Sequence, residues 1–200
     1  MLLPHPPLLL KQQVGPVPRE NEKRLRLTKA KESAAVRFKR ATLVSLAFGL
    51  MVVPAQAAKI GQFQKWTAHA VDSPQGKVCY IVAVPEKMLP KKVNRDDVFF
   101  YITTWAGQTK ITEPSVVTGY PYQPSSTTTV SIGASTASMF TKGDSAWVAD
   151  RANEKKLVNA MRAGSKMIVK GTSRRGTVTT DTYSLSGVTA GLKAIIKACS

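Results

Sequence analysis

Cys79 and Cys199 are the only cysteines of the 200-residue sequence, and they are the first residues whose types could do chemistry. Cys79 lies in an apolar segment with the character of a strand, and Cys199 is the penultimate residue. If the chain reaches an oxidising compartment, these two thiols are expected to form a disulfide that closes a long loop. A reactive thiol is the alternative, and Lys77 is the nearby cation that would support it.

His69 is the only histidine after residue 57, and no Cys, Asp or Glu lies at metal-ligand spacing around it. We therefore expect a strand histidine with a partly solvated ring, and no metal site. Asp96 and Asp97 are adjacent, so a strand would point them to opposite faces. They are expected to end the loop that precedes Val98.

The segment 133–137 resembles the nucleophile elbow Gly-x-Ser-x-Gly up to its last position, where alanine replaces the required glycine. The sequence therefore predicts no catalytic residues and no cofactor, and a protein that is not an enzyme. An enzyme that acts on envelope polymers is the alternative. It would need a cleft lined by Asp96, Asp97 or Glu113 near His69.

Two pairs of residues form a candidate binding surface. Tyr120 and Tyr122 alternate with prolines next to a small polar run, which indicates either an exposed loop or a stiffened connection between strands. Arg174 and Arg175 occupy a predicted hairpin turn and are expected at its exposed tip.

The charge balance is strongly basic, with 29 Lys and Arg against 12 Asp and Glu, a net charge of +17. This balance is typical of nucleic-acid binding. After residue 57, however, 19 basic and 9 acidic side chains are dispersed without long runs. We therefore expect no nucleic-acid partner unless residues 1–40 are retained. The expected partners are anionic envelope or host-cell surface components, attracted over long range.

An apolar run of 13 residues, 41–53, is too short for a membrane-spanning helix, which needs roughly 18 or more. It follows a basic segment and precedes Ala55-Gln56-Ala57. This order predicts a secretory signal peptide over 36–57, cleaved between Ala57 and Ala58, and a periplasmic or secreted protein with no transmembrane segment in its mature form. A buried core helix is the alternative.

Residues 1–35 contain five of the twelve prolines and no sustained apolar periodicity. They are predicted to be a disordered extension, or to be untranslated because the chain starts at Val36. Residues 58–200 then form one β-rich domain.

Most of this domain has the alternation or β-branched composition of strands. The predicted strands are 63–71, 77–84, 98–105, 115–122, 127–132, 145–148, 166–171 and 177–185. Helical periodicity predicts two short helices over 153–163 and 189–198. The predicted fold class is mainly β, a sandwich or barrel-like single domain with two short helices, preceded by a signal peptide.

The order of several motifs resembles the invasion-associated locus B (IalB) family of alphaproteobacteria. The resemblance covers residues 60–199, and its motifs are Phe63-x-x-Trp66, Val78-Cys79-Tyr80, the helix Leu157–Ala163 with Gly164, the segment 183–192 and Cys199. It implies an exported β-rich envelope protein connected with host-cell invasion, and none of these motifs is catalytic.

Overall fold

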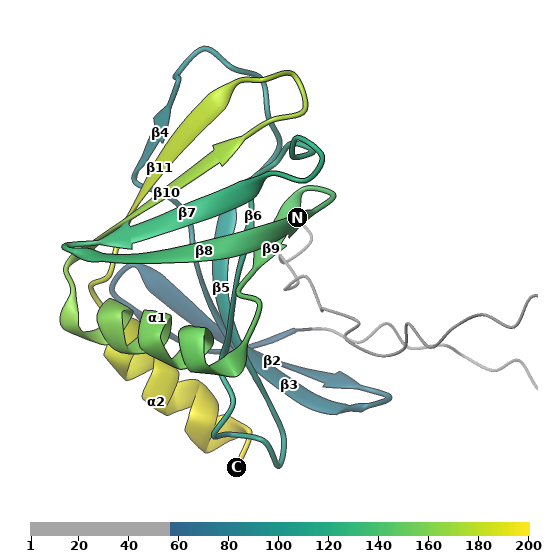
Figure 1. Cartoon of the computed structure of the whole chain (residues 1–200). Coiled ribbons are helices and arrows are strands. Elements are labelled where there is room, and N and C mark those ends of the chain that lie inside the picture. The colour runs from purple at the N-terminus through teal and green to yellow at the C-terminus, as the bar shows by residue number, and fades with distance from the viewer. Residues whose placement is uncertain (1–56) are drawn as a thin grey trace, which may run out of the picture. The chain divides into compact units, whose positions relative to one another are not determined.

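Much of the chain after residue 57 forms β-strands, and in several of them apolar residues alternate with polar ones. The computed structural model describes residues 57–200 and joins eleven strands into one antiparallel sheet (Figure 1). The strands are β1 (Ala58–Phe63), β2 (Trp66–Ser73), β3 (Gly76–Ala83), β4 (Lys87–Leu89), β5 (Phe99–Trp105), β6 (Glu113–Val117), β7 (Thr127–Ile132), β8 (Ser135–Lys142), β9 (Ser145–Trp147), β10 (Lys166–Thr172) and β11 (Val178–Ser184). The helices are α1 (Arg151–Ala163) and α2 (Val188–Ala198).

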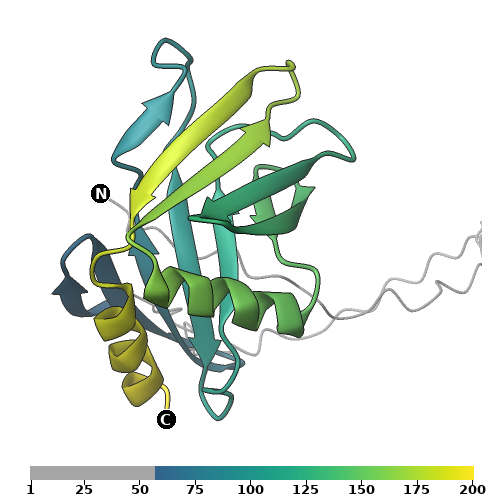
Figure 2. The ribbon, with the colours of Figure 1, turned by 60° about the vertical axis from the view of Figure 1, so that its left-hand side comes forward.

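The strand order is β1-β2-β3-β5-β6-β9-β8-β7-β10-β11-β4. The sheet bends so strongly that its two halves face each other (Figures 1 and 2). Phe100 of β5 meets Tyr183 of β11 edge to face, with ring centroids 5.8 Å apart. The Trp66 indole Nε1 also donates a hydrogen bond to the Ser184 carbonyl oxygen at 3.0 Å. The predicted mainly β, barrel-like single domain with two short helices is thereby confirmed.

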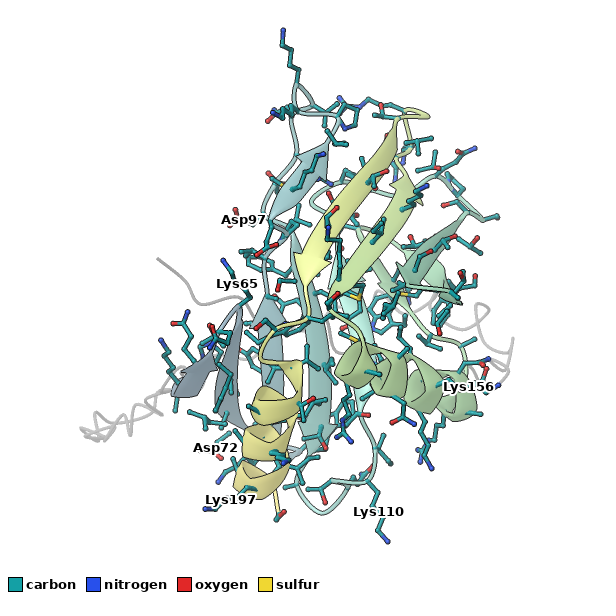
Figure 3. All side chains as sticks on the ribbon, turned by 90° about the vertical axis from the view of Figure 1, so that its left-hand side faces the viewer. Lys65, Asp72, Asp97, Lys110, Lys156 and Lys197 are labelled. Carbon is teal, nitrogen blue, oxygen red and sulfur yellow. A yellow bond between two sulfur atoms is a disulfide. The ribbon has the colours of Figure 1, made fainter. Side chains whose placement is uncertain are left out.

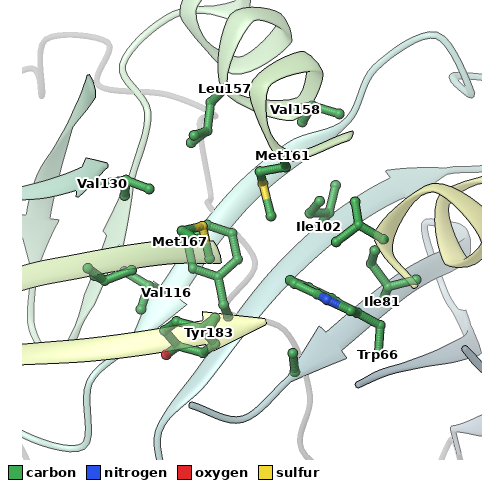
Figure 4. Packing of buried hydrophobic residues seen from close by; sticks show 14 of the residues in the cluster. Trp66, Ile81, Ile102, Val116, Val130, Leu157, Val158, Met161, Met167 and Tyr183 are labelled. Atoms are coloured by element: carbon green, nitrogen blue, oxygen red, sulfur yellow. The ribbon is translucent and has the colours of Figure 1, made fainter. Parts of the chain in front are cut away.

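The core lies between the two halves of the sheet and beneath the helices (Figure 4). Its largest fully buried side chains include Trp66, Phe100, Tyr183 and the methionines Met161 and Met167. Burial of these aromatic and aliphatic side chains is the main contribution to the folding stability of a domain of this size. A second, smaller cluster consists of Tyr80, Val82 and Tyr101.

Each helix begins and ends at residues suited to that position. The Asp150 carboxylate accepts a hydrogen bond from the Asn153 backbone N–H at 3.0 Å and so caps α1. Gly164 follows α1 where a Cβ would collide with Ile132. Gly187 precedes α2 with φ of 98°, and a Cβ there would collide with the Phe63 carbonyl oxygen. Glycine is therefore required at position 187.

Three strands were missing from the sequence prediction, namely β1, β4 and β8. The predicted strand 63–71 begins instead at Trp66, because a turn with Gln64 at φ of 54° separates it from β1. The predicted strand 115–122 was too long, since β6 ends at Val117 and the chain turns at Gly119 with φ of 68°. The signal peptide prediction lies outside the described residues.

Candidate functional site

The two cysteines are joined in a disulfide, with their Cα atoms 6.1 Å apart and their positions 120 residues apart in the sequence. Cys79 lies in β3 and Cys199 directly follows α2, and both are buried. The bridge therefore fixes the end of α2 to strand β3. Neither cysteine is a free thiol.

His69 lies in a row of side chains that crosses four neighbouring strands. It is directly opposite Tyr80, which is opposite Thr103, which is opposite Glu113. His69 is only 3% exposed and its ring stacks on Tyr80, with centroids 5.2 Å apart. The expectation of a partly solvated ring was therefore wrong, because the neighbouring ring covers it.

This row holds His69 and Glu113 apart, although the alternative enzyme would need them close together. Three strand intervals lie between His69 and Glu113, which corresponds to about 14 Å between their Cα atoms. That distance exceeds the reach of a direct hydrogen bond between an acid and a base. Asp96 and Asp97 are exposed in the loop before β5, as expected.

Tyr120 and Tyr122 are buried, at 7% and 4% exposure, so their assignment to an exposed surface was wrong. The Tyr120 hydroxyl lies 2.6 Å from the Thr179 hydroxyl, and the two tyrosine rings meet edge to face. Gly171 makes room for both side chains, because a Cβ there would lie 2.7 Å from the Tyr122 ring and 2.9 Å from the Tyr120 hydroxyl oxygen. These contacts draw the segment into the core.

Beside these tyrosines lies a buried ion pair that the sequence analysis missed. The guanidinium of Arg95 binds the carboxylate of Asp181 through two hydrogen bonds, and the two side chains are 5% and 1% exposed. Burial raises the pKa of Asp181, while the hydrogen bonds and charge of Arg95 oppose that rise. The sequence contained one signal of this burial. Asp181 alternates with Thr179 and Tyr183 in β11, so all three side chains point to the same, buried face of the strand.

Arg174 and Arg175 are exposed at the turn between β10 and β11, as predicted. The Arg174 backbone N–H donates to the Pro121 carbonyl oxygen at 2.8 Å. The structure thus brings together the two halves of the predicted surface, but it presents arginines to solvent and keeps the tyrosines inside.

A larger group of cations lies on the two helices. We call this group the helix face; its exposed members are Arg151, Lys155, Lys156, Arg162, Lys193 and Lys197. Figures 1 and 3 show α1 and α2 on the same side of the sheet, with Lys156 and Lys197 at their outer surfaces. The only acidic residue within either helix, Glu154, is buried. The exposed charged side chains within the two helices are therefore all positive, and the exposed Asp150 carboxylate caps the start of α1.

Neither helix of residues 57–200 is long and apolar enough to cross a membrane. The same range contains no group of three or more His, Cys, Asp and Glu side chains that could hold a metal ion.

Comparison with known proteins identifies a family and a similar solved structure. The family model of the invasion associated locus B (IalB) protein matches residues 66–196. The crystal structure of invasion associated protein b from Bartonella henselae is similar, with a TM-score of 0.51 and 16% sequence identity, over 72% of this chain and 98% of that chain. At this identity the similarity shows a shared fold. No curated protein matches the sequence.

Proposed function

Since the chain belongs to the invasion associated locus B family, we propose that it is an exported, non-enzymatic envelope or surface protein that acts by binding. Its partners are anionic components of the envelope or of a host-cell surface. The Bartonella protein is described as invasion associated, and a role of this chain in host-cell interaction is part of the same proposal.

The observation that carries the proposal is the helix face. Six exposed cations lie on two neighbouring helices, and no exposed carboxylate lies within either helix. Clustered charge of one sign raises the local concentration of opposite charges and steers association. Near an anionic membrane surface, each Lys or Arg contributes about 1 kcal/mol. This electrostatic attraction supports attachment through the helix face to an anionic surface.

The disulfide supports an exported location. Disulfides persist mainly in oxidising compartments such as the periplasm or the extracellular space. Export would also follow from the predicted signal peptide. Cleavage after Ala57 would leave the complete β1 strand, because β1 begins at Ala58.

The test is binding of the oxidised protein to vesicles that contain an anionic phospholipid. The Lys155→Glu/Arg162→Glu variant should bind at least about 10-fold more weakly than the unmodified protein. The matched control is Arg174→Glu/Arg175→Glu, which changes the net charge equally at the hairpin tip. Binding should also weaken as the screening length falls from about 10 Å at 0.1 M salt to about 3 Å at 1 M.

Three results would contradict this proposal, each in a different way. Equal losses in the two double variants would mean that net charge acts without the helix face. A larger loss in the Arg174 and Arg175 variant would move the site to the hairpin tip. Binding that does not change with salt would overturn the electrostatic proposal.

A further inference from the structure

One strand within the sheet, β8, is left partly unpaired on one side, in addition to the two outermost strands. β8 runs from Ser135 to Lys142, but its pairing with β9 covers only Phe140–Lys142. On the other side, β7 pairs with β8 from Ser135 to Phe140. Within residues 57–200, no other strand pairs with 135–139 on the side that β9 leaves open. Five consecutive residues therefore present a free strand edge.

The two outer strands carry features in their own sequence or register that discourage pairing with another chain, and the open part of β8 carries none of these, although α1 lies alongside it. β1 has a register irregularity between Lys59 and Gly61. β4 is three residues long, begins with Lys87 and is followed by Pro90. Bulges, lysines, prolines and short length are the usual protections of an edge strand. The open part of β8, with the sequence STASM, has no charge, proline or glycine.

A groove separates this edge from helix α1, which lies alongside β8 in Figure 1. The cavity volume is about 910 Å³, within the range of ligand-binding clefts. Its floor includes the buried side chains Val130, Ile132 and Leu157, and its helical wall includes Lys156. Five strand residues extend about 17 Å, and the 13 residues of α1 about 20 Å. The edge and the helix are therefore matched in length.

We propose that this groove binds an extended peptide segment of a partner protein, which adds a strand to residues 135–139. Backbone hydrogen bonds to the β8 edge would supply affinity, as in other cases of strand addition. Alternate apolar side chains of the peptide would meet the floor, and acidic side chains would face Lys156. The only acidic residue lining the groove, Asp150, is already engaged by two hydrogen bonds from Asn153.

Other occupants fit less well. An acyl chain would cover the amide and carbonyl groups of the β8 edge without giving them hydrogen-bond partners, which is unfavourable. A second copy of the domain would bring a whole sheet to the edge, and α1 lies across its path. Residues 1–57 of this chain carry 10 basic and 3 acidic side chains, so Lys156 would repel them.

The experiment measures binding of a fluorescent six-residue peptide of alternating Val and Glu to the oxidised protein. A peptide of alternating Val and Lys tests whether binding requires negative charge on the peptide. Two Val and Glu peptides, N-methylated at odd or at even positions, test the backbone hydrogen bonds. Lys156→Glu should weaken binding of the acidic peptide about 10-fold, and Ala160→Phe, which fills the groove, should abolish it. The matched control Lys110→Glu makes the same charge change in the exposed loop after β5, away from the groove and the helix face, and should leave binding unchanged.

Nuclear magnetic resonance locates the bound peptide. The backbone amides of 135–139 should shift and become protected from hydrogen exchange when the acidic peptide binds. The proposal is overturned if neither the Val and Glu peptide nor the Val and Lys peptide binds. It is also overturned if both N-methylated peptides bind as well as the unmethylated Val and Glu peptide, or if a fatty-acid probe occupies the groove in preference to the peptides. None of these results depends on vesicle binding, so this proposal and the proposed function can fail separately.

Discussion

Arg95 and Asp181 form an ion pair inside the protein, with Arg95 Nη1 3.0 Å from Asp181 Oδ2. The two residues are 86 positions apart in the sequence. Arg95 also lies over the Tyr120 ring, 6.0 Å from its centroid. The pair thus fastens the long connection between β4 and β5 to strand β11.

Removing one partner of this pair should be more harmful than removing both. Arg95→Met leaves the Asp181 carboxylate buried without its counter-charge, and should lower the free energy of unfolding by about 3–5 kcal/mol. The double variant Arg95→Met/Asp181→Leu should recover most of that loss. Urea denaturation of the three proteins measures both effects. A double variant as unstable as the single one would show that the ion pair itself is net stabilising.

The disulfide between Cys79 and Cys199 should stabilise the fold mainly by restricting the unfolded chain. Cys199→Ser should therefore lower the free energy of unfolding by roughly 2–4 kcal/mol. The control is the unmodified protein under reducing conditions, which should lose a similar amount. Labelling of both thiols in the native, unreduced protein would contradict the bridge.

All five tyrosines should resist ionisation until the protein unfolds. Burial raises the pKa of Tyr80 to about 12, and it also raises the pKa values of Tyr101, Tyr120, Tyr122 and Tyr183. The folded state therefore favours the neutral phenols, and their contribution to stability is fully present below pH 10 and declines as the pH rises towards 12. Tyrosinate absorbance and circular dichroism should change together in this window. Gradual ionisation near pH 10 with an intact fold would contradict the burial.

Processing should produce a mature protein that begins at Ala58. The basis is the apolar run followed by Ala55-Gln56-Ala57. Intact-mass measurement and N-terminal sequencing of the protein from its native host check this directly. A dominant form that still carries Met1 or Val36 would refute the prediction.

Local sequence patterns predicted the elements whose alternation or helical period is strong. The helix over 153–163 and the strand over 127–132 are examples, because apolar positions and end signals agree there. The strand β8 escaped prediction because its first residues are small and polar. The three residues of β4 are too short for a periodic pattern.

The burial of Tyr120 and Tyr122 could not be predicted from their surroundings in the sequence. Their prolines and polar neighbours indicate a loop, and a loop is what the backbone forms. The partners that bury the rings, Gly171 and Thr179, lie about 50 to 60 residues further along the chain. The pairing of Arg95 with Asp181 depends on the same long-range arrangement.

The position of β4 has a kinetic consequence. After β3 the chain crosses to the far edge of the sheet, pairs β4 with β11, and then returns to form β5 beside β3. β4 and the connection that returns from it to β5 therefore cannot reach their final arrangement before β11 has been synthesised. Such distant pairings delay folding to milliseconds or seconds. A chain whose last sheet pairings wait for β11 is incompletely folded while it is being made, and this would be compatible with the export proposed above.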